Sequence, residues 1–154
     1  MSKETDQSIV CLASIAGCAE TLQITRAFAR VDIKQAVDAT YKACEVAIYN
    51  WPGFSNMHWI KARREEFKAF IATEKDTGHS AVSVIYMCAQ IIEDMIDEYD
   101  YSKEKMAMLV PVKTEIDKLV AFCDRDGSNF PAMEKAWDLV DRLYKIIGKK
   151  EMAK

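Results

Sequence analysis

The stretch DIKQAVDATYKACEVAIYNW, residues 32–51, carries the clearest structural signal in the chain. Its apolar side chains recur every three or four residues, which places them on one stripe of an α-helix. Asp32 with Gln35 three residues later predicts a capping box at the first turn, and Pro52-Gly53 predicts the end of the helix. The pattern therefore indicates an amphipathic helix that buries the following side chains in a core: Ile33, Ala36, Val37, Tyr41, Cys44, Ala47, Ile48 and Trp51.

The same spacing predicts five more helices along the chain, with approximate bounds of 7–29, 56–72, 80–99, 103–123 and 130–147. Ser55 or Asn56 is expected to cap the second of these and Ser102 the fourth, whereas Gly148 is expected to end the last. Strict alternation of apolar and polar residues, the signal of a strand, does not exceed the helical signal anywhere. The sequence thus predicts an all-α, single-domain bundle of five to six helices over residues 1–154, with residues 1–6 and 149–154 frayed.

Two helices are expected to carry one buried and one outward stripe. The helix at 56–72 should bury Met57, Ile60, Phe67, Phe70 and Ile71 and turn outward Arg63, Arg64, Glu65 and Lys68. The helix at 130–147 should bury Met133, Trp137, Val140, Leu143, Tyr144 and Ile147.

The helix at about 80–99 is apolar around most of its girth, which predicts a largely buried central position. Its expected neighbour is the helix at 7–29, because Ala13, Ala16, Gly17 and Ala19 leave little bulk between two backbones. Pro111 falls inside the helix at 103–123, where it removes a backbone hydrogen bond and predicts a kink or a break.

Composition excludes several classes of protein. Half of the 154 residues are apolar, and a net charge of −3 is too close to balance to recruit nucleic acid or an anionic membrane. The apolar run Ile9–Ala19 is shorter than the roughly 18 residues of a membrane span, and no basic region precedes it. The five cysteines are odd in number and form no CxxC pair, which favours buried free thiols in a reducing, cytoplasmic compartment.

Residues that could support chemistry are few. The chain has two histidines, no HExxH motif and no cysteine pair, so the sequence predicts no catalytic residue, no metal site and no cofactor. A cluster of acids at the end of the helix at 80–99 forms a candidate contact face for a basic partner: Glu93, Asp94, Asp97 and Glu98. Acids at a helix carboxyl end oppose the helix dipole, so this placement has a small energetic cost.

The turn after residue 51 has an unusual composition, because turns normally carry polar residues. It contributes five candidate partner-binding residues: Trp51, Phe54, Met57, His58 and Trp59. Either these rings fold over the end of the bundle as a lid, or they stay exposed and anchor a partner, since Trp is enriched at interface hot spots.

Three functions are compatible with these observations. The first is a non-enzymatic protein-protein interaction module, such as an adaptor, an inhibitor or an immunity-type factor, with a homodimer as its variant. The second is a helical bundle that binds a small apolar ligand among its eight methionines. The third is a metal-dependent enzyme that uses the carboxylates of Glu93, Asp94 and Asp97.

Overall fold

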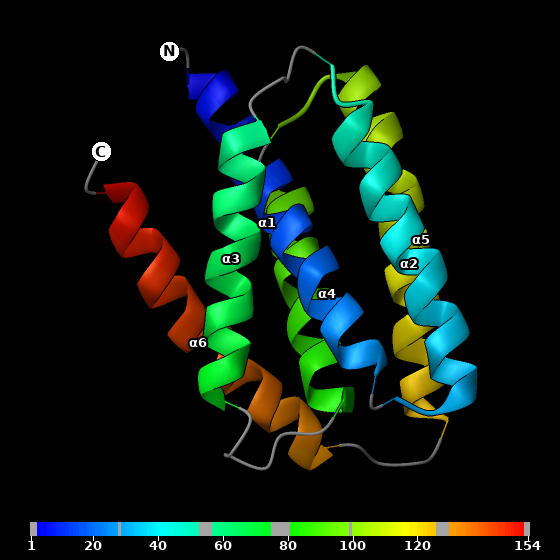
Figure 1. Cartoon of the computed structure of the whole chain (residues 1–154). Helices are drawn as coiled ribbons and strands as arrows, with labels where there is room; N and C mark the ends of the chain where they lie inside the picture. The colour runs from blue at the N-terminus through cyan, green and yellow to red at the C-terminus, as the bar shows by residue number, and fades with distance from the viewer. Residues whose placement is uncertain are drawn as a thin grey trace.

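The computed structural model of the chain describes residues 3–27, 29–52, 57–74, 81–98, 100–125 and 130–152. Within these ranges every regular element is an α-helix, which confirms the all-α class, and Figure 1 shows their arrangement. The six helices are α1 (Lys3–Arg26), α2 (Val31–Tyr49), α3 (Met57–Glu74), α4 (Ala81–Glu98), α5 (Lys103–Asp124) and α6 (Phe130–Met152).

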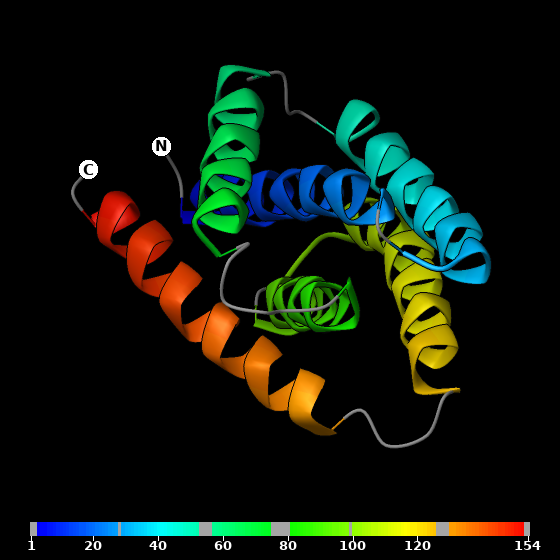
Figure 2. The same ribbon diagram turned by 60° about the horizontal axis from the view of Figure 1, so that its bottom comes forward.

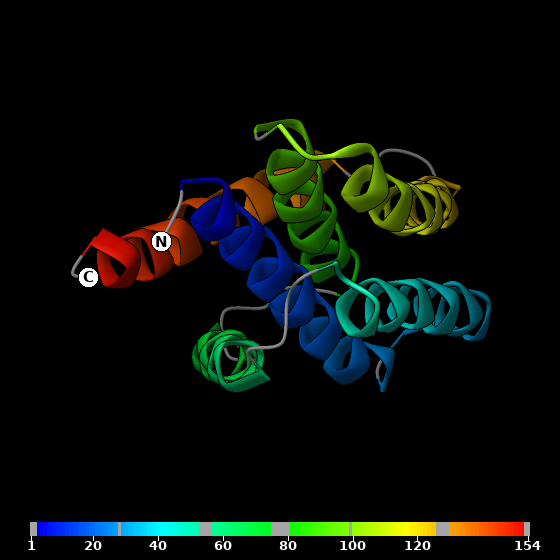
Figure 3. The ribbon, with the colours of Figure 1, turned by 90° about the horizontal axis from the view of Figure 1, so that it is seen from above.

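Helix α1 packs against α2, α3 and α4, and Figure 3 shows it running between α3 and α4. Every residue from Cys11 to Ala19 is buried. By length and composition the part Ile9–Arg26 could span a membrane, but 67% of that window is buried inside the structure. A helix that is apolar all round and covered by three neighbours is typical of the core of a globular domain.

A close contact between α1 and α3 depends on Gly17. A Cβ atom at this position would lie 2.5 Å from Cδ1 of Phe67, whose ring rests directly on the α1 backbone. The Thr21 hydroxyl donates a hydrogen bond of 3.0 Å to the Gly17 carbonyl, so the polar side chain next to this contact is satisfied within the helix. The small residue is therefore required by the packing of Phe67.

The ends of α2 differ from the prediction. The helix begins at Val31 with Arg30 as the N-cap residue, and no side chain caps it, so the predicted Asp32–Gln35 capping box is wrong. Asp32 lies inside the first turn, where its carboxylate accepts a hydrogen bond of 2.9 Å from the backbone N–H of Ile33. The negative charge of Asp32 also interacts favourably with the helix dipole at this end. This explains an acidic residue in the first turn without a capping box.

The cap of α5 is confirmed, because the Ser102 side chain accepts a hydrogen bond of 3.3 Å from the backbone N–H of Lys105. The predicted break at Pro111 is wrong, because α5 continues without interruption from Lys103 to Asp124. Both Pro111 and Ala107, whose carbonyl loses its helical partner, lie on the exposed side of the helix. Water can reach that carbonyl, which lowers the cost of the proline; the kink stays a prediction.

Helix α6 also extends beyond its predicted end, since it passes through Gly148 and reaches Met152. A glycine inside a helix costs only about 1 kcal/mol relative to alanine, so it does not have to end one. The predicted cap of α3 at Ser55 or Asn56 lies outside the described residues.

Candidate functional site

A groove of about 240 Å³ lies between α5 and α6, with α4 as its floor. Both α5 and α6 pack against α4, and Figure 2 shows α4 between them. The floor consists of Tyr86, Ala89, Gln90, Ile92 and Glu93, and the walls of Lys113, Ile116, Asp117, Val120, Met133, Ala136 and Trp137. We call this feature the α5–α6 groove.

Trp137 on α6 is the largest side chain in the wall of the α5–α6 groove, and it is 50% exposed. Its predicted burial is therefore wrong. Leu139, Val140 and Leu143 of the same helix are buried, so α6 packs through a stripe that leaves Trp137 at its margin. The physical reason is that α6 packs on α4 and also contacts α3 through the Arg142–Glu74 ion pair, whereas Trp137 lines the groove between α6 and α5.

Two other exposed apolar side chains lie one helical turn from the lining of the groove. Val110 is 57% exposed and precedes the lining residue Lys113 by three positions on α5. Phe130 is 55% exposed and precedes the lining residue Met133 by three positions on α6. Residues three apart share a helix face, so both walls continue as apolar surface beyond the groove itself.

The residues of the predicted acidic face do not share one environment in the structure. Glu93 and Asp97 are exposed, and Glu93 lines the α5–α6 groove. Asp94 is half-buried and accepts hydrogen bonds from the Tyr144 hydroxyl at 3.0 Å and from Gln90 Nε2 at 2.8 Å. It therefore joins α4 to α6, whereas the side chain of Glu98 lies outside the described residues.

The predicted aromatic site is also divided. Trp51 is only 3% exposed, and its ring meets that of Tyr101 edge-on at a centroid distance of 6.1 Å. The ammonium of Lys105 lies 5.9 Å from the Trp51 ring, so this tryptophan covers the junction of α2 with the start of α5. Trp51 thus takes the position of a lid.

The other members of the aromatic site are described less completely. His58 is exposed and Trp59 is partly exposed at the start of α3. Phe54 lies outside the described residues, and so does the side chain of Met57.

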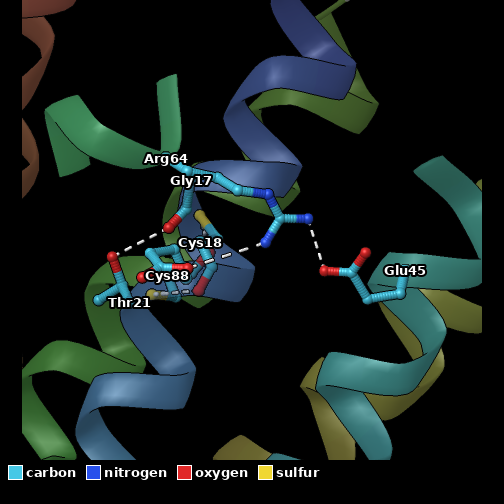
Figure 4. Close-up of polar contacts among 7 residues, drawn as sticks. Gly17, Cys18, Thr21, Glu45, Arg64 and Cys88 are labelled. Atoms are coloured by element: carbon cyan, nitrogen blue, oxygen red, sulfur yellow. Dashed lines mark hydrogen bonds and ion pairs between the residues drawn. The ribbon is translucent and has the colours of Figure 1, made fainter. Parts of the chain in front are cut away.

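Two arginines of α3 that were expected to point outward do not. Arg63 is buried, and the Arg64 guanidinium forms an ion pair of 2.5 Å with Glu45 of α2 and one of 4.0 Å with Glu20 of α1. Figure 4 shows Arg64 reaching toward Glu45. Arg64 is partly covered because α2 and α3 both pack on α1, which brings its guanidinium close to the carboxylates of these helices. These ion pairs link α3 to α1 and α2. Glu65 and Lys68 are exposed, as expected.

All five cysteines are free and buried, as the sequence predicts. Cys18 and Cys88 each direct their thiol to the other's backbone carbonyl at 3.8 Å (Figure 4). Burial raises the pKa of Cys11 to about 11 and the pKa of Cys44 to about 12. The thiolate is the reactive form, so these thiols are poor nucleophiles at neutral pH.

Metal ligation has no support in the described part of the chain. Among those residues, no three His, Cys, Asp or Glu side chains are grouped so that they could hold a metal ion. The carboxylates of Glu93 and Asp97 are exposed.

Sequence reasoning did not find Trp137, Lys113, Asp117 or Val120 as site residues. One signal was available, because α6 carries more large apolar side chains than one stripe can bury, including Phe130, Trp137 and Ile146. No protein-family model, curated protein or solved structure matches the chain, so its own geometry must support any functional assignment.

Proposed function

We propose that the protein is a non-enzymatic protein-protein interaction module that binds a segment of its partner in the α5–α6 groove. One observation supports this most strongly: Trp137 is half exposed in a concave surface that also contains Met133 and Val120. Tryptophan dominates binding energy at protein interfaces when it lies beside a pocket that a partner can fill.

The surroundings of Trp137 support a macromolecular partner. The lining combines an apolar part, formed by residues such as Val120 and Met133, with the charged residues Glu93, Lys113 and Asp117. An apolar centre with a polar rim is the usual composition of a protein interface. Exposed Val110 and Phe130 extend the apolar surface beyond the groove, which a partner larger than the groove could use.

Binding of a small apolar ligand is less well supported by the same groove. Its volume of about 240 Å³ is below the range of about 300–1,000 Å³ that is common for ligand pockets. The reducing interior of a cell is part of our proposal, because the five buried cysteines are all free.

Capture from a native lysate by the purified chain tests the proposal when two variants of exposed aromatic residues are compared. Trp137→Ser should abolish capture of the specific partner, whereas Tyr49→Ser, which changes an aromatic side chain that is 68% exposed on α2, should leave capture unchanged. Both variants should keep the helical circular dichroism spectrum and the melting temperature of the wild type. Equal capture by both variants would remove the α5–α6 groove from the proposed function.

A homodimer is the variant of this proposal, and sedimentation velocity at micromolar concentrations tests it. A dimer that dissociates on Trp137→Ser would assign the groove to a second copy of the chain.

A further inference from the structure

The charge of the α5–α6 groove indicates which class of partner fits it. Helix α4, from Ala81 to Glu98, contains no lysine or arginine, and its last two turns carry Glu93, Asp94, Asp97 and Glu98. The carboxyl end of a helix also carries a partial negative charge of about half an elementary unit. Beyond Glu93, the floor of the groove continues into the carboxyl end of α4, where the side chains and the helix dipole both contribute negative charge.

The walls do not compensate this charge. Glu93 and Asp117 both line the groove and are exposed, and Lys113 is the single base among the lining residues. Within the described part of the chain, the salt bridges involve neither Glu93 nor Asp117. Asp97 follows Glu93 by four positions, so the two carboxylates share one helix face. Cations from outside the chain would relieve their mutual repulsion and their opposition to the helix dipole.

The dimensions of the groove favour a helical segment. Its floor runs from Tyr86 to Glu93 of α4, and the seven steps between these residues span about 10 Å at a helical rise of 1.5 Å per residue. Two turns of a partner helix have this length and present apolar side chains at positions i, i+3, i+4 and i+7. Such a segment would place its apolar side chains against Trp137, Met133 and Val120, with its polar flank beside the carboxylates.

From these observations we infer that the α5–α6 groove binds a basic amphipathic helix of a different protein, with an apolar stripe on Trp137 and lysine or arginine beside Glu93 and Asp117. This inference rests on the proposed function and names the partner class. A second copy of the chain is a poor occupant, because a two-fold interface centred on the groove would bring the same carboxylates of both copies together.

The experiment selects binders for the full-length chain from a displayed library of 18-residue amphipathic helices. The library keeps one apolar stripe and varies the polar positions among lysine, arginine, glutamate, aspartate, serine and glutamine. Selected peptides are synthesised with a fluorescent label, and their Kd values are measured by anisotropy with the wild type, Trp137→Ser and Tyr49→Ser. Peptides whose binding is weakened at least tenfold by Trp137→Ser and less than twofold by Tyr49→Ser are classed as groove binders.

We expect the groove binders to have a positive net charge and to bind less tightly as salt is raised from 50 to 500 mM. Glu93→Gln with Asp117→Asn should weaken them three- to tenfold. The matched pair Glu65→Gln with Glu104→Gln changes the net charge equally but at exposed positions outside the groove, and it should change Kd less than twofold.

The outcomes separate the two proposals. Groove binders that are neutral or acidic, or that respond equally to both pairs of charge changes, would overturn the basic-helix inference and leave the proposed function intact. If no selected peptide depends on Trp137, the proposed function itself fails.

Discussion

The α1–α3 contact and the α5–α6 groove are built from the same kinds of side chain but have opposite surface character. At the first, the Phe67 ring rests on the backbone at Gly17, where a single added carbon would lie 2.5 Å from the ring, and Phe67 has no exposed surface. At the second, Trp137 is half exposed. The difference teaches that an aromatic residue on an apolar helical stripe becomes core or surface according to whether a neighbouring helix packs directly on its ring.

The largest expected effect comes from truncating Phe67, the aromatic residue at the α1–α3 contact. Phe67→Ala should lower the free energy of unfolding by about 3–5 kcal/mol, because it removes buried apolar surface and leaves a cavity against Gly17. The matched truncation Phe130→Ala, at a ring that is 55% exposed, should cost about 0.5 kcal/mol or less. Urea unfolding of both variants measures the contrast, and equal losses would contradict the comparison.

The next effect concerns the space at Gly17. Gly17→Ala should destabilise the protein by about 1–3 kcal/mol, because overpacking against Phe67 outweighs the gain in helix propensity. In a Phe67→Ala background the same change should become neutral or stabilising, by up to about 1 kcal/mol, since the steric conflict is gone. Additive effects in this double-mutant cycle would show that Gly17 and Phe67 do not interact as the structure places them.

A smaller effect concerns the buried thiol of Cys44 on α2. Burial raises the pKa of Cys44 from an ordinary 9.0 to about 12, so between these values the unfolded chain releases a proton that the folded chain keeps. Stability present below pH 9 is therefore lost as the pH rises toward 12, by about 1.4 kcal/mol per pH unit for this thiol.

Urea unfolding at pH 8, 9, 10 and 10.5 should show a shallower loss for Cys44→Ala than for the wild type. Val84→Ala, a core truncation without an ionisable group, should keep the wild-type slope. Identical slopes for all three proteins would mean that Cys44 ionises in the folded state as readily as in the unfolded chain.

The smallest expected effect is at the α5–α6 groove. Trp137→Ser should change the free energy of unfolding by about 0.5 kcal/mol or less, because much of the ring is already in water. Trp51→Ala, at a side chain that is 3% exposed, should cost several times more, about 3–5 kcal/mol. A large loss of stability for Trp137→Ser would indicate that this residue belongs to the core and not to a binding surface.

Sequence reasoning predicted the helices well because the period of 3.6 residues is a local property. The cap at Ser102 and the buried stripe of α2 from Ile33 to Ile48 follow from that pattern and are present in the structure. The capping box at Asp32 was an error because an acidic residue has two local explanations at a helix start, as a cap or as a first-turn acid. At Pro111 the helix is not broken, and the kink that the sequence also allowed stays a prediction.

For the candidate site, sequence reasoning was less successful. It named the acids of α4, of which Glu93 lines the groove while Asp94 is hydrogen-bonded to Tyr144 of α6. It placed Trp137 in the core and Arg63 and Arg64 outward, because a helical stripe indicates which residues share a face but not which faces are covered.

The amino-acid sequence by itself determined that this chain is all-α and where its helices lie, because hydrogen bonding and apolar periodicity act over a few residues. Only the tertiary structure decided that Phe67 is core and Trp137 is surface. Their exposure depends on the contacts of α1 with α3 and of α4 with α5 and α6, which join residues far apart in the chain. The surplus of large apolar side chains on α6 indicates that some of them stay exposed, but no local pattern encodes which ones.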